Sequence, residues 1–223
     1  MLTIVFDLDG TLVDTAPDLI DALDLALAAA GLPGVSYHSA RKLIGGGAKA
    51  MIERALTAAG CSFSTVQVDR LYAAFIAHYS AHIADRSRPF PGLERVLDDL
   101  AVAGHRLAVC TNKLEWLAVR LLRTLNLARH FAAICGQDTF GVQKPDPTIL
   151  RQTVLRAGGE PARAILVGDS GTDVRTARAA ELPVVAVDFG YSEVPIATLA
   201  PDAVISSYAE LPAAIGELAA AWT

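Results

Sequence analysis

Six short apolar runs alternate along the chain with segments of helical periodicity, and this alternation limits the possible folds more than any other feature. Each run has the length of a strand and is apolar at nearly every position. Strands of this kind are buried on both faces, so the pattern predicts an α/β fold with a parallel sheet covered by helices on each side. The predicted strands are Ile4–Phe6, Leu107–Cys110, Ala133–Cys135, Ile165–Val167, Val184–Val187 and Val204–Ile205.

The first crossover of this sheet is much longer than one helix requires. After Asp14 the next predicted strand begins only at Leu107, and three helical patterns fill part of the gap. These patterns cover Leu19–Leu27, Met51–Ala59 and Leu71–Tyr79. We therefore predict a helical cap domain at residues 15–84, inserted into a core formed by residues 1–14 and 85–223. Asp14 and Asp18, at the first junction, are interpreted as hinge or helix-start carboxylates rather than catalytic groups.

The composition narrows the class of protein and its surroundings. Apolar residues make up 52% of the 223 residues, and the formal net charge is −5. Such a chain forms a core, and its mild acidity argues against a nucleic-acid partner. It has no apolar stretch long enough for a bilayer and no signal-peptide pattern, so we expect no membrane association. Three scattered cysteines predict neither disulfides nor zinc, and favour a cytoplasmic protein. We expect it to be a monomer or a homodimer.

Polar side chains gather where the predicted strands end. In an open parallel sheet, ligands bind at the carboxyl ends of the strands, so these side chains are expected to lie close together. They are Asp7 and Asp9 after the first strand, Thr111, Asn112 and Lys113 after the second, Lys144 after the third, and Asp169 and Asp173 after the fourth. Clustered carboxylates repel one another and lose hydration on burial, so they need a compensating charge. A metal ion with an anionic substrate accounts for the set.

The residue types at these strand ends suit phosphoryl transfer. Mg²⁺ prefers oxygen ligands, which Asp7, Asp169 and a backbone carbonyl near Asp9 supply. Lys144 and the Thr111 hydroxyl suit the negative charge that spreads over a phosphoryl group. The carboxylate of Asp7 is available as a nucleophile, and that of Asp9 as a general acid and base.

Four segments resemble the four motifs of the haloacid dehalogenase (HAD) superfamily: "DLDGTLVDT", "VCTNK", "KPDP" and "VGDSGTD". The resemblance covers nearly the whole chain and implies a Rossmann-like, HAD-like core with an α-helical cap. By position, Asp7 matches the family's nucleophile and Asp9 its general acid and base. In the same way Thr111 matches the phosphate-binding hydroxyl and Lys144 the lysine that stabilises the phospho-intermediate. Asp169 matches the metal ligand, and Asp173 the second acidic residue of the metal site.

The second aspartate of "DLDGT" resembles the phosphatase and phosphomutase branch of the superfamily. Within that branch, "LIGGGAKAMIERAL" and "SRPFPG" are most similar to phosphoglycolate phosphatases. The resemblance thus implies a Mg²⁺-dependent phosphomonoesterase that forms an aspartyl phosphate, with 2-phosphoglycolate as the expected substrate. Two alternatives stay open: a sugar phosphomutase of the same superfamily, and a signalling module phosphorylated on aspartate.

Cap residues are expected to choose the substrate. Gly45, Gly46 and Gly47 precede a helix and can present backbone N–H groups to a small anion such as a carboxylate. Arg41 is a further candidate for substrate binding, and Asn112 a candidate for placing the phosphate. Other residues are left open. Lys42 and Lys49 near the glycines are either a solvated face or part of a positive cleft, and so is Lys113; His78 and His82 have a zinc-like spacing without a third ligand.

Overall fold

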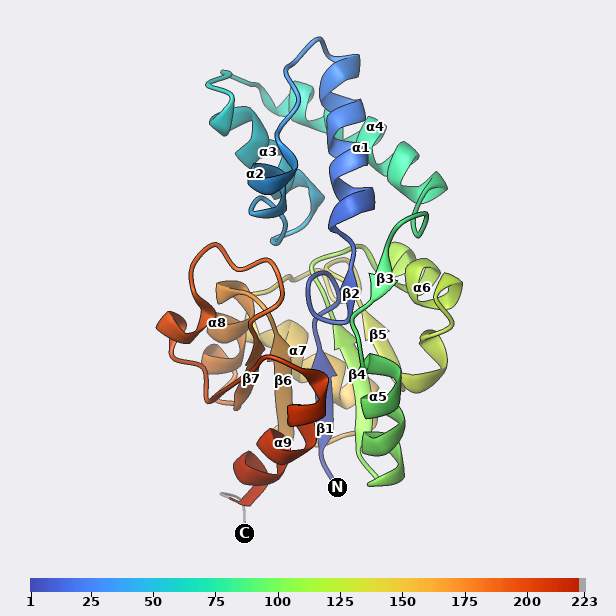
Figure 1. Ribbon diagram of the computed structural model, residues 1–223, viewed down its shortest axis with the longest axis vertical. Coiled ribbons are helices and arrows are strands. Elements are labelled where there is room, and N and C mark those ends of the chain that lie inside the picture. The colour runs from blue at the N-terminus through green and yellow to red at the C-terminus, as the bar shows by residue number, and fades with distance from the viewer. Residues whose placement is uncertain (221–223) are drawn as a thin grey trace.

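A computed structural model describes residues 1–220 of the chain, and its centre is a six-stranded parallel sheet (Figure 1). The strand order is β5-β4-β1-β6-β7-β8, so the first strand lies in the middle. The strands are β1 Thr3–Phe6, β4 Arg106–Cys110, β5 Ala133–Cys135, β6 Ala164–Gly168, β7 Val184–Val187 and β8 Ala203–Ile205. Phe6, at the end of β1, pairs with Val109 of β4 and Val167 of β6. The predicted α/β class and parallel sheet are confirmed.

Helices cover both faces of the sheet because its apolar side chains alternate between them. Ile4 and Phe6 point into one apolar cluster, and Val5 points into another. Packed on the first face are α5 Leu93–Val102, α6 Glu115–Thr124 and α9 Leu211–Ala220. Packed on the second are α7 Pro147–Arg156 and α8 Gly171–Ala179. Three 3₁₀ turns complete the core: η1 Ala128–His130, η2 Ile196–Leu199 and η3 Tyr208–Glu210.

Four helices form a cap above the carboxyl ends of the strands, away from the N-terminus and from α9 (Figure 1). They are α1 Ala16–Ala29, α2 Tyr37–Arg41, α3 Ala48–Ala58 and α4 Thr65–Ala81, all within the predicted insert. Local sequence explains where they start. Pro17 stands in the first turn of α1, and Ser64 forms a capping box with Gln67 at the start of α4. The short helix α2 has no counterpart among the predicted elements.

Two connections join the cap to the core, and they pair with each other as a small antiparallel ladder. It consists of β2 Val13–Asp14 and β3 Arg88–Pro89. Beside it, the Asp18 carboxylate is 3% exposed and accepts bonds from the backbone N–H groups of Arg86 and Ser87, at 3.0 and 2.8 Å. Asp18 therefore fastens the start of α1 to the returning chain, which agrees with its interpretation as a hinge carboxylate.

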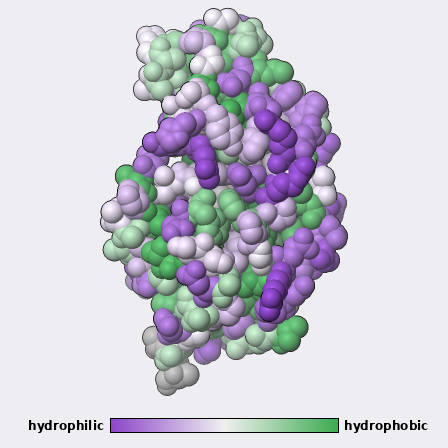
Figure 2. Space-filling model, viewed as in Figure 1, coloured by the Kyte–Doolittle hydropathy of each residue, from purple (hydrophilic) through white to green (hydrophobic). Residues whose placement is uncertain are grey.

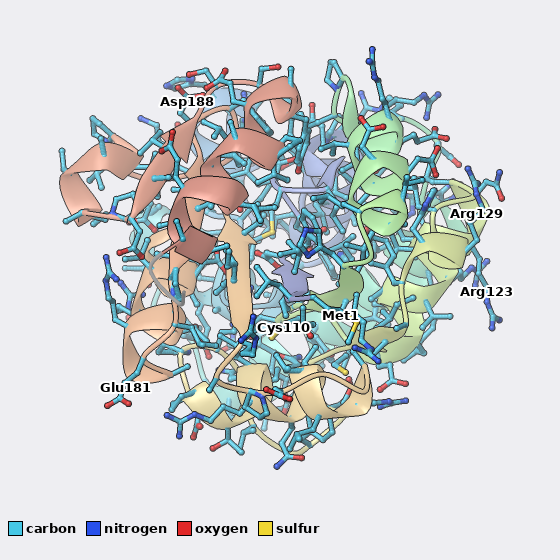
Figure 3. All side chains as sticks on the ribbon, turned by 90° about the horizontal axis from the view of Figure 1, so that it is seen from below. Met1, Cys110, Arg123, Arg129, Glu181 and Asp188 are labelled. Atoms are coloured by element: carbon cyan, nitrogen blue, oxygen red, sulfur yellow. The ribbon has the colours of Figure 1, made fainter. Side chains whose placement is uncertain are left out.

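One face of the surface, the helices and the cysteines bear on the expectation of a globular chain without disulfides. On the face in Figure 2, hydrophilic residues gather around the level at which cap and core meet, and hydrophobic residues are scattered elsewhere. Within residues 1–220 no helix has the length and apolarity needed to cross a membrane. Figure 3 looks from the end opposite the cap: Cys110 lies inside the core, whereas Arg123, Arg129 and Glu181 project from its rim. All three cysteines are free thiols.

Candidate active site

The site begins where β1 ends and the backbone turns sharply. Asp7 follows the strand directly, and its Oδ1 accepts a bond of 2.7 Å from the N–H of Leu8. Gly10 has a φ of +84°, and a Cβ there would lie 2.4 Å from Oδ2 of Asp169. A side chain at position 10 would displace this carboxylate, so glycine allows the first loop to approach the end of β6.

Three carboxylates from two strand ends meet beneath this turn. Asp7, Asp169 and Asp173 each place an oxygen within 4.8 Å of the others. Asp169 accepts bonds from the Thr11 hydroxyl at 2.9 Å and from the N–H of Tyr191 at 2.7 Å. Burial, followed by the neighbouring carboxylates, raises the pKa of Asp169 to about 8. Three clustered carboxylates need compensating positive charge, and their all-oxygen donor set fits Mg²⁺.

Lys144 supplies one of the positive charges at this cluster. Its Nζ lies 2.9 Å from Asp7 and 2.6 Å from Asp173. Burial alone would lower the pKa of this ammonium, but Asp173 and Asp7 outweigh it, so the pKa is raised and Lys144 stays charged. For Asp7, burial outweighs Lys144 and raises the pKa to about 6.

The amide of Asn112 fixes the position of Lys144. Its Nδ2 donates to the carbonyl of Lys144 at 3.0 Å, and its Oδ1 accepts from the N–H of the same residue at 2.8 Å. We expected this side chain to place the phosphate. The structure directs both ends of its amide to the lysine backbone, and Asn112 also lines the cavity described below, so its contact with phosphate stays a prediction. Thr111 is 2% exposed, and its hydroxyl accepts from the N–H of Lys113 at 3.2 Å.

Asp9 points away from the carboxylate cluster, toward the cap. Its Oδ1 accepts from the Thr15 hydroxyl at 2.7 Å and lies 3.0 Å from Nζ of Lys113. The side chain of Asp9 is thus separate from the Asp7, Asp169 and Asp173 group, and its metal contact through the backbone carbonyl stays a prediction. The separation suits two roles, with Asp7 at the phosphorus and Asp9 at the leaving group.

A small cavity lies between these residues and the cap. The volume open to the centres of water-sized molecules is about 60 Å³. By the same measure, one water molecule needs roughly 10–15 Å³. Its floor is mostly polar and its roof mostly apolar. The core lines it with Asp7, Asp9, Thr111, Asn112, Lys113, Leu114, Leu117, Gln137, Lys144, Ser170 and Thr172. The cap lines it with Leu19, Ile44, Gly45, Gly46, Gly47, Ala48, Met51, Tyr72, Phe75, Ile76 and Tyr79.

The three glycines lie in the cavity wall, at the start of α3. Gly47 precedes the helix with a φ of +90°, and a Cβ there would meet the carbonyl of Asn112 and Oε1 of Gln137 at 3.0 Å. The cap loop therefore rests directly on the core. Gln137 was not among the predicted residues, because nothing in its local sequence distinguishes it from an ordinary loop residue.

Arg41 lies outside the cavity wall, contrary to the position we expected. Its guanidinium donates to the carbonyls of Phe189 and Gly190 at 3.2 and 3.4 Å, and it lies over the ring of Tyr191. Arg41 thus joins the cap to the loop after β7, in which the N–H of Tyr191 donates to Asp169.

Other open residues are placed away from the catalytic groups. Lys49 pairs with Asp69 on the surface, and Lys42 is exposed. His78 and His82 stack on each other, and within residues 1–220 they belong to no group suited to metal binding.

Comparison with known proteins agrees with this arrangement. Residues 4–187 match the model of the haloacid dehalogenase-like hydrolase family. The chain belongs to this family. It is 49% identical over 214 residues to a phosphoglycolate phosphatase of Mesorhizobium japonicum, covering 96% of this chain and 94% of the relative. It is 48% identical to the phosphoglycolate phosphatase of Agrobacterium fabrum, covering 96% and 91%.

A solved structure shows the same fold over nearly the whole chain. It is described as a predicted phosphoglycolate phosphatase from Haemophilus somnus, with a TM-score of 0.88 and 28% identity. The alignment covers 96% of this chain and 97% of that one. The resemblance to the HAD superfamily is therefore confirmed, and the chain is an enzyme of a hydrolase family.

Proposed function

We propose that this HAD enzyme is a Mg²⁺-dependent phosphomonoesterase whose preferred substrate is 2-phosphoglycolate. The observation that carries the proposal is the floor of the cavity. There the partly buried carboxylate of Asp7 lies 2.9 Å from the Lys144 ammonium, and Asp9 lines the same cavity on the cap side. A nucleophile, a cation for phosphate oxygens and a separate acid thus face one cavity. The names of the relatives point to the same reaction.

In the proposed mechanism an oxygen of Asp7 attacks the phosphorus atom. The bond between phosphorus and the ester oxygen breaks as Asp9 gives its proton to the leaving alcohol, and an aspartyl phosphate forms on Asp7. Asp9 then takes a proton from the water that attacks the same phosphorus atom. The bond between phosphorus and the Asp7 oxygen breaks, inorganic phosphate leaves, and the Asp7 carboxylate is restored. Lys144 and the Thr111 hydroxyl bind phosphate oxygens throughout.

The acidic cluster is where the metal ion is proposed to bind. Asp7 and Asp169 would hold it, with Asp173 in support and a backbone carbonyl near Asp9 as a further ligand. When bound, Mg²⁺ supplies positive charge that offsets the carboxylates and the phosphate oxygens. Asp173 also helps to cap α8, since its Oδ2 accepts from the backbone N–H of Ser170 at 3.1 Å and from the Ser170 hydroxyl at 2.6 Å.

The cap limits which esters can react. The cavity is small, and its roof is mostly apolar, so it excludes bulk water and favours a short leaving group. We propose that Gly45, Gly46 and Gly47 close over the leaving group with their backbone N–H groups. We also propose that the enzyme is cytoplasmic.

A phosphate-release assay over a panel of esters tests the proposal. We expect kcat/KM for 2-phosphoglycolate to exceed that for ethyl phosphate and for hexose phosphates by about tenfold or more, with loss of activity in excess chelator. If a hexose phosphate is the best substrate, the proposed preference for 2-phosphoglycolate is wrong, while the proposed phosphatase activity still holds. Retention of phosphate on a sugar product would support the phosphomutase instead, and a single self-phosphorylation without turnover would support a signalling role.

A further inference from the structure

Lys113 is a buried cation at the cap side of the cavity, where the proposed mechanism gives it no role. Its side chain is 5% exposed, and its Nζ lies 3.0 Å from Asp9 and 3.1 Å from the hydroxyl of Tyr79 on α4. Burial alone would lower the pKa of Lys113, but Asp9 and Tyr79 outweigh it, so the pKa is raised and the ammonium is charged. The other cavity lysine, Lys144, is committed to Asp7 and Asp173. Lys113 is therefore the cation that a leaving group meets.

Both Lys113 and Tyr79 retain a hydrogen-bond donor for a ligand. An ammonium has three N–H donors, and within residues 1–220 Asp9 and Tyr79 account for two of those on Lys113. Tyr79 accepts from Lys113, so its own O–H must donate elsewhere, and in the same part of the chain it has no acceptor. Burial raises the pKa of Tyr79 to about 12, which keeps the hydroxyl protonated.

The surroundings strengthen any charge–charge contact made at this pair. Tyr79 is 1% exposed and stacks on Phe75, and the roof beside it includes Leu19 and Met51. Ionic hydrogen bonds gain strength where water is excluded. An anion of the leaving group would thus be favoured here over a neutral group of the same size.

We propose that Lys113 and Tyr79 form the subsite that binds the carboxylate of the substrate. The inference rests on the proposed function, since it assigns the second anionic group of 2-phosphoglycolate to named side chains. The carboxylate accepts one N–H from Lys113 and the O–H of Tyr79 while Lys113 keeps its contact with Asp9. Because Lys113 belongs to the core and Tyr79 to the cap, the carboxylate also joins the two domains when the cap is closed.

The test compares 2-phosphoglycolate with O-phosphoglycolamide, a phosphate ester of nearly the same shape whose leaving group carries a neutral amide in place of the carboxylate. The quantity measured is the ratio of their kcat/KM values in the wild type and in the variants Lys113→Met, Tyr79→Phe and Lys42→Met. We expect a wild-type ratio of about ten or more, because ionic hydrogen bonds are worth more than neutral ones. Lys113→Met should bring the ratio close to one, and Tyr79→Phe should lower it roughly threefold. Lys42→Met, at an exposed lysine, should leave it unchanged.

The outcomes separate the subsite from the proposed function. A wild-type preference that survives in both Lys113→Met and Tyr79→Phe overturns the subsite and returns carboxylate recognition to the glycine loop. Equal losses on both esters in Lys113→Met show that Lys113 only orients Asp9, which also overturns it. If the wild type hydrolyses neither ester, the proposed function fails as well. Should Lys113→Met not fold, Tyr79→Phe decides, because it keeps the ring, its packing and the Lys113–Asp9 pair.

Discussion

Asp7 carries two demands that conflict in the absence of a ligand. It has to be ionised to attack phosphorus, yet burial raises its pKa to about 6. Lys144, 2.9 Å away, favours the ionised form, and a bound cation would do so further. Asp7 can therefore act as a nucleophile only together with the positive charges beside it.

Replacing Asp7 by Asn should abolish turnover and preserve the fold. An amide of the same shape is a poor nucleophile and a weaker metal ligand, so we expect kcat to fall by at least roughly a thousandfold. Phosphate release by the purified variant measures this, and circular dichroism checks the fold. Substantial residual activity in a folded Asp7→Asn protein would exclude Asp7 as the nucleophile.

The connection between cap and core depends on one buried carboxylate at the start of α1. Asp18 accepts from two backbone N–H groups and from the Ser87 hydroxyl. Asp18→Ala should lower the free energy of unfolding by roughly 2–4 kcal/mol, because it leaves buried donors without acceptors. Asp21→Ala is the matched control, since Asp21 lies on the same helix and pairs with Arg86 at the surface. Urea unfolding should show a change of only about 0.5 kcal/mol for the control. Equal losses in the two variants would contradict the assigned hinge role.

Arg41 joins helix α2 to the loop after β7 through the carbonyls of Phe189 and Gly190. Arg41→Ala should therefore weaken closure of the cap and raise KM for every ester by a similar factor of about three to ten. The preference for 2-phosphoglycolate over its amide should not change, because Arg41 does not line the cavity in the described part of the chain. A collapse of that preference would show instead that Arg41 binds the substrate, as its sequence position had suggested.

Sequence predicted those features that are encoded locally. The six strands and the place of Asp7, Asp9, Asp169 and Lys144 follow from apolar runs and the residues that end them. The pairing of β2 with β3 did not follow, because two-residue strands are defined by distant contacts, such as that of Val13 with Pro89, 76 positions further along the chain. Lys113 stayed undecided for the same reason, since its burial depends on the cap residue Tyr79.

At the scale of the whole molecule, charge balance links the metal site to stability. In the folded state the pKa is raised to about 6 at Asp7 and to about 8 at Asp169, from an ordinary value of 3.8. The folded protein then binds protons more tightly than the unfolded chain, so protonation stabilises it at low pH. Without a divalent cation, this contribution is complete below about pH 4 and is lost as the pH rises through about 6 and 8.

Mg²⁺ should therefore stabilise the protein more at pH 8 than at pH 5. The cation binds the ionised carboxylates of the folded state, so it replaces the protons that are lost as the pH rises. We expect the difference in Tm between excess Mg²⁺ and excess chelator to grow over this range. Asp169→Asn removes the carboxyl group whose pKa is raised to about 8, so the pH dependence of that difference should be much smaller in this variant. A Mg²⁺-induced shift in Tm that is equal at every pH would show that the ion binds away from Asp7 and Asp169.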